Sequence, residues 1–388
     1  MTNITGVRTT NNIATARVVV DMADKIAQLH PTDARFVTLL KQIKSDKRVA
    51  YAPKFEWLED DLLANKTAVD GEVSTTSATS VTVDDGSIIR PWDIIKLPAT
   101  GECLLVTAVN SNELTVVRGY GSTAAAAIAD DAEVLVVGNA QAENAGARDV
   151  RSTTESNNYN YTQIFRTPIA LSGTEQATKL YGGKDRAYQR AKAAKEHKRD
   201  IALSMYFGER KQDTSGGTPR RTMGGLVEFL KTGSSSFAFA SSGGTTLTWD
   251  NFNTNVAKKA FEYGSDTKLM VCGPNMIAAI DKWAMDKNSI RQHDAEHKFG
   301  LSIDTLITSF GELKVLYDPL LSGATYGGYA LILDMDNIRY AYLDGRDTKL
   351  LVDIQNPDVD GIVDEYLTEC SLEVKLPKTH MLVTGCYV

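Results

Sequence analysis

The chain has 388 residues, of which 43% are hydrophobic and 23% charged, and its formal net charge is −7. This length allows two or three domains with cores of their own, and the composition is that of a globular protein. No apolar run approaches the roughly 18 residues of a membrane span, and no charged-then-apolar leader opens the chain. We therefore expect a soluble protein that is made in a cytoplasm and has no membrane partner.

Charge is distributed unevenly along the sequence. Residues 1–50 carry eight Lys and Arg against four Asp and Glu, and residues 184–221 carry eleven against five. Residues 71–147 and 334–369 each carry three against ten. This pattern indicates either two faces that meet different surroundings or charges that all lie on solvated loops, and it leaves both open.

Residues 1–48 are polar at first and then weakly helical, with Pro31 interrupting. So few apolar groups cannot form a core, which predicts an extended arm that becomes ordered against something else. Its apolar anchors are Val18, Val19, Val20, Ile26, Phe36 and Leu39.

The amino-acid composition changes after residue 48. Residues 49–63, VAYAPKFEWLEDDLL, are apolar and acidic together and predict a short amphipathic element that packs Trp57 on a core. From Gly71 to Asn139 follow the short β-branched runs SVTV, DIIKL, CLLVTAV, ELTVV and EVLVV, separated by turn residues. They predict a small antiparallel barrel or sandwich, inserted between the arm and a later body.

The clearest helix prediction covers residues 184–207 and ends at Gly208. A shorter helix before it is predicted from the capping-box spacing of Ser172 and Glu175. The long helix has a narrow, mostly alanine seam with Lys198 in its gap, so we expect it to lie across a sheet rather than in a bundle. The seam residues are Ala187, Ala191, Ala194, Ile201 and Met205.

The rest of the chain alternates helices and strands. Thr248 caps a predicted helix that closes at Gly264, and Pro274 opens another that runs to Met285. The runs KLMVC, ELKVLYD, YALILD and IRYAYL predict strands of an α/β layer, and the tail after residue 349 is rich in strands.

Three patterns resemble chemical sites and fall short of them. Gly119 opens a loose GxGxxA pattern, but the next strand begins too soon for a dinucleotide-binding crossover, so we predict a tight turn. His293 and His297 stand four apart without the glutamate of a zinc protease, and a solvated segment is favoured.

The acids at 334–347 lack the glycine and glutamate positions of an EF-hand. Those at 358–365 are interpreted as a solvated edge rather than a cation site. The four cysteines form no CxxC pair and are interpreted as buried thiols. They are Cys103, Cys272, Cys370 and Cys386. We therefore predict no cofactor and no metal.

Between residues 160 and 230 the sequence has TQIF, then SGTEQA, then a long helix ending KEHKRDIALSMYFG, then RRTMGGLVEFL. This order resembles the major capsid proteins of tailed phages, in the SU-ten-type branch of the Hong Kong 97-like fold. The resemblance covers about residues 50–388. It departs at Ala202, where members often place an acid.

The resemblance implies an α+β, Hong Kong 97-like capsid fold in four parts. These are an N-terminal arm (1–48), an extended loop (49–165) with a β-barrel or sandwich insertion at about 71–139, a peripheral domain (166–232 and 336–388) whose spine helix covers about 184–207, and an axial α/β domain (233–335).

The implied function is that of a major capsid protein, not an enzyme, which assembles into hexamers and pentamers of an icosahedral shell around double-stranded DNA. The implied partners are further copies of the chain, a separate scaffolding protein, a portal, a decoration or cement protein, and packaged DNA contacted without sequence specificity. We expect assembly in the host bacterial cytoplasm, no removed N-terminal domain, and a final location in the virion.

Ten residues are candidates for assembly or genome contacts. The basic ones would neutralise DNA phosphates or pair with acids of a neighbouring subunit. The candidates are Glu56, Trp57, Lys184, Arg186, Arg190, Lys192, Lys195, Arg199, Arg220 and Arg221.

Two other classes of protein remain open. One is a soluble α/β enzyme with a β-barrel insertion, although no GxSxG, Walker or Cys/His nucleophile pattern is present. The other is a ligand-binding or adhesion module with residues 71–139 as its binding face.

Overall fold

A computed structural model describes residues 34–43, 47–148, 150–179, 184–233, 235–239, 246–287 and 304–386. The chain divides into two compact units. The barrel unit is Leu58–Asn157, and the body comprises the described residues up to Trp57 and from Asn158 onward. The predicted His293–His297 pattern and four arm anchors (Val18, Val19, Val20 and Ile26) lie outside the described residues.

One layer of the body is a five-stranded sheet centred on the long strand β20. β10 pairs antiparallel with β20 over ten residues, β18 and β19 pair with its other edge, and β1 adds to β18 in parallel. The strands are β1 (Arg48–Ala50), β10 (Gln163–Ser172), β18 (Ile338–Leu343), β19 (Lys349–Leu351) and β20 (Gly361–Val374).

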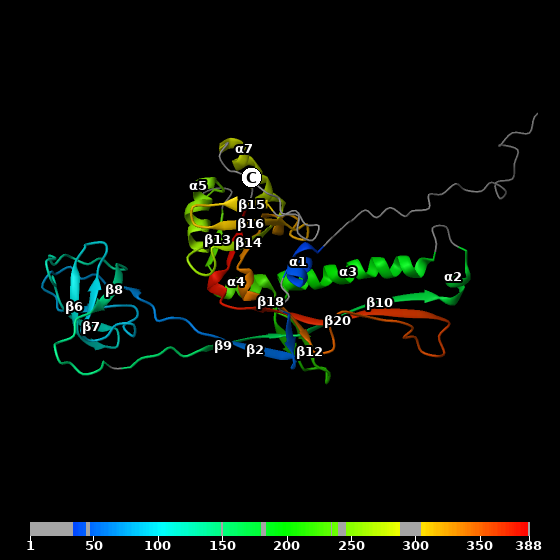
Figure 1. Cartoon of the computed structure of the whole chain (residues 1–388), viewed down its shortest axis with the longest axis horizontal. Coiled ribbons are helices and arrows are strands. Elements are labelled where there is room, and N and C mark those ends of the chain that lie inside the picture. Colours follow the sequence, from blue (N-terminus) through cyan, green and yellow to red (C-terminus); the bar gives the residue numbers. More distant parts are fainter. Residues whose placement is uncertain are drawn as a thin grey trace, which may run out of the picture. The chain divides into compact units, whose positions relative to one another are not determined.

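The helix α3 (Asp185–Phe207) lies along β10 and β20, as the alanine-rich seam predicted (Figure 1). The short helix α2 (Gly173–Ala177) precedes it, and the hydroxyl of Ser172 accepts a hydrogen bond from the Glu175 amide, which confirms the predicted cap.

The predicted seam is correct only in the second half of α3. Ile201 and Met205 are buried, but Ala187 and Ala191 are exposed. The first half rests on the sheet through charged and polar side chains instead, described below. Ala202 is fully buried, so an acid at this position would lie in the core.

Gly208 ends α3, as predicted, and close contact with the following chain explains why it is glycine. Its backbone is extended, with φ −61°, and a Cβ here would lie 2.5 Å from the carbonyl oxygens of Ser204 and Met223. Close approach of the following chain therefore requires glycine. That chain forms the hairpin β11 (Lys211–Asp213) and β12 (Arg220–Thr222), then α4 (Leu226–Gly233).

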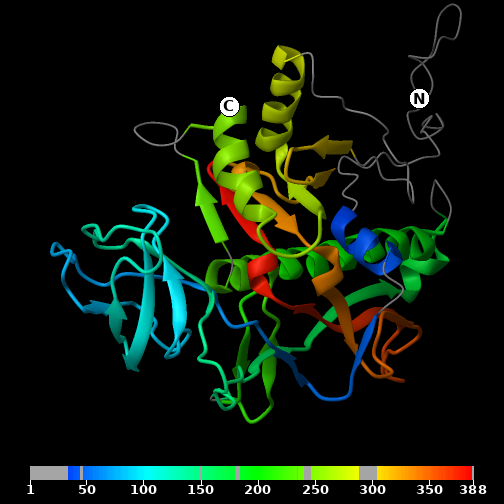
Figure 2. The same ribbon diagram turned by 60° about the vertical axis from the view of Figure 1, so that its left-hand side comes forward.

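The second layer of the body is a mixed six-stranded sheet in the order β13-β21-β17-β14-β16-β15. One face packs toward α3 and α4, and the helices α5 to α7 cover the other (Figure 2). The strands are β13 (Ser235–Ala238), β14 (Thr267–Cys272), β15 (Asp304–Ile307), β16 (Glu312–Tyr317), β17 (Ala330–Leu333) and β21 (Met381–Thr384).

The helices predicted in this layer are present. Thr248 caps α5 (Trp249–Phe252), which continues through a π-helical turn at Asn253–Ala257 into α6 (Lys258–Ala260), and α7 covers Pro274–Lys287. In the part of the chain that the structure describes, no helix is long and apolar enough to cross a membrane.

The described part of the predicted arm packs against the body of its own chain. Its helix α1 (Arg35–Ile43) buries Phe36 and Leu39 in the core of the body. The buried Asp318 carboxylate accepts hydrogen bonds from the Phe36 amide (3.4 Å) and the Tyr206 hydroxyl (2.7 Å), so it joins α1 to the end of α3. Burial raises the pKa of Tyr206, which keeps the phenol protonated as the donor.

The barrel unit is a six-stranded antiparallel sheet in the order β3-β8-β5-β6-β7-β4. A bridge between Val69 and Val83 joins its two end strands, so the sheet closes into a barrel around an aliphatic core. The strands are β3 (Lys66–Ala68), β4 (Ser80–Thr82), β5 (Asp93–Lys96), β6 (Cys103–Asn110), β7 (Glu113–Val117) and β8 (Glu133–Asn139).

The glycine pattern after β7 is a turn that folds around a buried carboxylate. Glu102 binds the Arg118 guanidinium at 2.8 and 2.9 Å and accepts hydrogen bonds from the amides of Gly119 and Ala126 at 3.0 Å. The amide of Gly119, the first residue of the glycine pattern, is thus bonded to Glu102. Despite opposing burial, these contacts hold the pKa of Glu102 below its usual range.

Lys268 is a buried cation that sequence patterns did not reveal. Its Nζ donates to the carbonyls of Ala260 and Tyr263, at the end of α6, and of Thr379, at 2.5 to 2.6 Å. A lysine in this place satisfies the unpaired carbonyls of a helix end and ties them to the C-terminal segment.

Replacing Lys268 with Met should lower the free energy of unfolding by about 2–4 kcal/mol, because three carbonyls, two of them in buried contacts, lose their donor. Urea denaturation measures the change. Lys258→Met, at an exposed position of α6, is the matched control and should stay within about 0.5 kcal/mol of the parent. Equal effects of the two substitutions would contradict the structural role of Lys268.

His380 should make stability depend on pH. Its Nδ1 accepts a hydrogen bond from the Asp334 amide (2.9 Å), and burial lowers its pKa to about 4. Because the unfolded chain takes up this proton near pH 6.5 and the folded chain near 4, stability should fall by up to about 3 kcal/mol as the pH drops across that window. His380→Asn keeps an acceptor that does not titrate, so urea denaturation from pH 7 to 4 should show a shallower fall. An unchanged slope would assign the pH dependence to other groups.

Candidate assembly and genome-contact surfaces

Two of the candidate arginines bind within the subunit. Arg186 donates to both oxygens of Asp364 at 2.7 and 2.9 Å and to Asp353 at 2.7 Å, and Arg190 donates to Asp364 at 2.8 Å. Asp364 is 1% exposed. The hydrogen bond from Arg186 is the main reason that its pKa lies well below the usual range. These two cations therefore fix α3 to β20.

About two turns beyond Arg190 along α3, His197 also binds the sheet. Its ring nitrogens lie 2.9 Å from the Thr167 hydroxyl of β10 and 2.7 Å from the Thr368 hydroxyl of β20. Burial lowers the pKa of His197, so the neutral imidazole bridges the two strands. The spine helix is thus held to the sheet by directional polar bonds before its apolar half begins.

The remaining candidates on α3 and before it lie on its solvent side. Lys184, Lys192 and Lys195 are exposed, and Arg199 is partly exposed. Lys192 lies 4.0 Å from Glu196 and Arg199 lies 3.9 Å from Asp200, contacts that are weak at a solvated surface. This solvent side of α3 is therefore mildly basic.

The opposite face of β20 carries a row of three buried glutamates, Glu365, Glu369 and Glu373. Each is paired with cations: Glu365 with Arg166, Glu369 with Arg346 and the candidate Arg221, and Glu373 with Arg48 and Lys375. Sequence reasoning missed this row because it read the acids at 358–365 as a solvated edge. The signal was the spacing of four, which places all three acids on one face of a strand.

Glu56 and Trp57 lie on β2 (Lys54–Glu59), which pairs with β9 (Ser156–Tyr161) in a two-stranded ribbon. Trp57 is buried, with its ring 6.1 Å from that of Phe229 on α4. Glu56 is exposed, 2.5 Å from Lys54. Of the two candidates, Trp57 therefore anchors the ribbon and Glu56 faces solvent.

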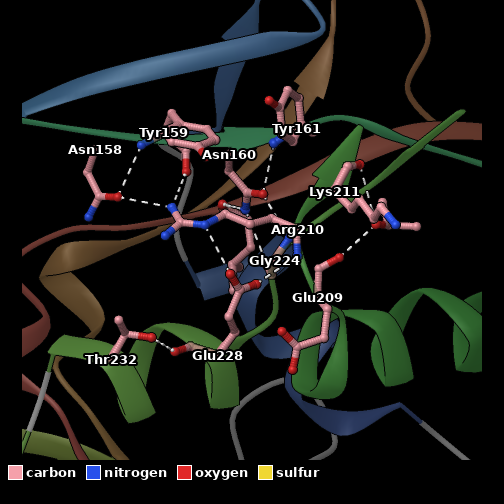
Figure 3. Close-up of polar contacts among 12 residues, drawn as sticks. Asn158, Tyr159, Asn160, Tyr161, Glu209, Arg210, Lys211, Gly224, Glu228 and Thr232 are labelled. Atoms are coloured by element: carbon pink, nitrogen blue, oxygen red, sulfur yellow. Dashed lines mark hydrogen bonds and ion pairs between the residues drawn. The ribbon is translucent and has the colours of Figure 1, made fainter. Parts of the chain in front are cut away.

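Figure 3 shows the polar groups that bind residues 158–161 of β9. Arg210 donates to the Asn158 side chain (3.2 Å) and the Tyr159 carbonyl (2.9 Å), and it pairs with Glu228 at 3.0 Å. The Asn160 side chain exchanges hydrogen bonds with Gly224 at 2.8 and 3.1 Å. Since Arg210 follows α3 and Glu228 lies on α4, this cluster ties the ribbon directly to both helices.

Arg220, on β12, is exposed at the tip side of the β11–β12 hairpin. Among the described residues, no group of three or more His, Cys, Asp and Glu is arranged to hold a metal ion. The candidate residues thus separate into internal ion pairs (Arg186, Arg190 and Arg221), a core anchor (Trp57) and surface groups. The surface groups are Glu56, Lys184, Lys192, Lys195, Arg199 and Arg220.

The chain matches the SU10 major capsid protein family over residues 3–387. It is 25% identical over 283 residues to a major capsid protein of Pseudomonas phage PaMx41, covering 71% of this chain and 68% of that protein.

Solved capsid structures are also similar. For the Cyanophage A-1(L) capsid the TM-score is 0.52 at 10% identity, with 96% of this chain and 98% of that chain covered. For the capsid of Myoviridae phage XM1 the TM-score is 0.49 at 11% identity, with 96% and 99% covered.

The likeness to the cyanophage capsid confirms the predicted α+β, Hong Kong 97-like capsid fold. A family match over nearly the whole chain decides between the three classes of protein left open by the sequence. The protein is a phage capsid protein that associates with copies of itself, and it is not an enzyme. The chain belongs to the SU10 major capsid protein family.

Proposed function

We propose that this capsid protein forms the hexamers and pentamers of an icosahedral shell that encloses double-stranded DNA. The observation that carries the proposal is the exposure of large apolar side chains beside the ribbon: Tyr51 is 85%, Leu62 91% and Val150 96% exposed. Among the described residues nothing covers these apolar side chains, so neighbouring copies would bury them.

The proposal divides the chain as the family resemblance implied. Residues 1–48 serve as the arm, 49–165 as the extended loop, 166–232 with 336–388 as the peripheral domain, and 233–335 as the axial domain that meets its copies around the local symmetry axis. Many modest contacts repeated around a closed surface then stabilise the shell.

A second apolar surface supports the same proposal. The loop between β19 and β20 exposes Val352, Ile354 and Val359 by 41 to 50%. It belongs to the sheet that α3 covers, on the part of the body assigned to the peripheral domain. A contact here would join subunits at a second place, as a closed shell requires of each of its copies.

For the genome, the proposal assigns the solvent side of α3. Lys184, Lys192, Lys195 and Arg199 provide a mildly positive surface that neutralises phosphates without reading bases. Arg186 and Arg190 are excluded from this role by their bonds to Asp364. The further partners proposed are a separate scaffolding protein, a portal and a decoration protein, with assembly in the host cytoplasm.

Leu62→Asp should reduce the yield of closed shells at least tenfold while leaving the melting temperature of the unassembled chain unchanged, because Leu62 is 91% exposed among the described residues. Size-exclusion chromatography with negative-stain microscopy measures shell yield. The matched control, Leu104→Ala in the barrel core, should lower the melting temperature. Normal shells from Leu62→Asp would argue against an interface at this segment.

Lys192→Gln combined with Lys195→Gln should weaken binding of the purified chain to duplex DNA and reduce the slope of log affinity against log salt by up to about 2. Arg186→Gln serves as the contrast: it should leave the slope unchanged and lower the melting temperature, since it breaks two ion pairs. Fluorescence anisotropy at several salt concentrations measures both. An equal change of slope in the two proteins would remove α3 from the genome-facing surface.

A further inference from the structure

The barrel unit is strongly acidic, yet its few cations are gathered. Residues 58–157 carry sixteen Asp and Glu against six Lys and Arg. Arg118 is enclosed by its bonds to Glu102, and Lys66 pairs with Glu133. Three of the other four basic residues gather at the loop between β4 and β5. Arg90 belongs to this loop, and Arg148 and Arg151 donate to its backbone carbonyls. The barrel therefore carries a cluster of basic residues although the unit as a whole is acidic.

The register of β8 shows that this basic cluster and a cluster of four aspartates lie at opposite ends of the barrel. At its start, Glu133 pairs with Ala68 at the end of β3. At its end, Asn139 pairs with Asp93 at the start of β5. Seven residues of extended strand separate the two ends by about 20 Å. The barrel therefore has two poles.

The acidic pole surrounds the closing bridge at Val69. The amides of Asp70 and Asp84 bond across this bridge at 3.0 Å, and the amide of Asp131 donates to the Val69 carbonyl at 3.0 Å. Asp130 is adjacent in the same loop. All four aspartates are exposed, so four carboxylates face solvent within one strand end.

The basic pole is built around Trp92, whose carbonyl accepts the amide that follows β8 at 2.8 Å. Arg148 binds the buried Asp93 at 2.7 Å, and Arg151 donates to two carbonyls of the loop before Arg90. Burial, with Arg90 and Arg148 nearby, lowers the pKa of Arg151, as expected for like charges held close together. Three arginines thus lie around the buried carboxylate of Asp93.

Trp92 is 48% exposed and has φ +70°. A bulky side chain rarely adopts this left-handed conformation, in which glycine or asparagine is usual. The barrel thus keeps an aromatic ring in solvent at a position where its own folding favours a smaller residue. Strain of this kind concentrates at binding sites.

We propose that barrels of neighbouring subunits dock head to tail, with the Trp92 pole of one against the four-aspartate pole of the next. The inference rests on the proposed shell function and names one of its contacts. Opposite poles on one module make a heterologous contact, which closes into a ring when the rotation between copies permits. Charge complementarity sets the order, and Trp92 supplies the apolar area.

Covalent cross-linking of the full chain tests the contact. Trp92→Cys and Asp84→Cys are combined in a Cys103→Ala background, because Cys103 is the partly accessible native thiol. A short bis-maleimide should link the two introduced thiols of different copies and give a ladder of covalent oligomers on denaturing gels. Each single-cysteine protein should give no ladder, since like poles do not meet.

Trp92→Gly separates docking from folding, because glycine suits φ +70° and should hold or raise the melting temperature while shell yield falls several-fold. Cross-linking is measured both in shells and in concentrated unassembled protein. Shells without a ladder, or a Trp92→Gly protein that assembles like the parent, would overturn the docking and leave the shell function intact. Absence of shells in the parent would instead count against the proposed function, and the ladder in solution still decides the docking.

Discussion

The central strand β20 carries carboxylates on both of its faces, and the body depends on how they are neutralised. Toward α3, Asp364 holds Arg186 and Arg190. On the opposite face, three glutamates hold cations from β1, β10 and the loops around them. Removing a charge from water is costly unless the partner is well placed, so each pair fixes the angle at which its segment meets the sheet. The segments that pack on this sheet are therefore oriented by ion pairs and hydrogen bonds and not only by the burial of apolar area.

The elements that were predicted correctly are those with signals in the local sequence. The long helix was predicted at 184–207 and is found at Asp185–Phe207, and the five predicted barrel strands correspond to β4 through β8. Both rest on local signals: helical periodicity with a glycine stop for the helix, and β-branched runs between turns for the strands. β3 was missed because its three residues are too short to show alternation.

The failures have a common cause. Ala187 and Ala191 were assigned to the buried seam because a helical period gives the spacing of side chains and not the nature of the surface that receives them. Arg186 and Asp364 lie 178 residues apart, and no periodicity within either segment points to the other. Lys268 is similar in part: one of its three acceptors, the Thr379 carbonyl, lies 111 residues away and becomes a neighbour only after the C-terminal segment returns to the sheet. Long-range polar pairing is therefore the part of this fold that composition and pattern leave undetermined.

The two ends of the barrel unit leave it side by side: the Ser156 hydroxyl donates to the Glu59 carbonyl at 3.3 Å, and the Thr153 hydroxyl donates to Asp60 at 2.8 Å. When the two ends of an inserted domain are adjacent, the host sheet does not constrain the length or topology of the inserted domain. Such a junction lets recombination exchange, enlarge or delete the insert while the host sheet keeps its register. Variation among related shells can then accumulate at this point at little cost to the remainder of the chain.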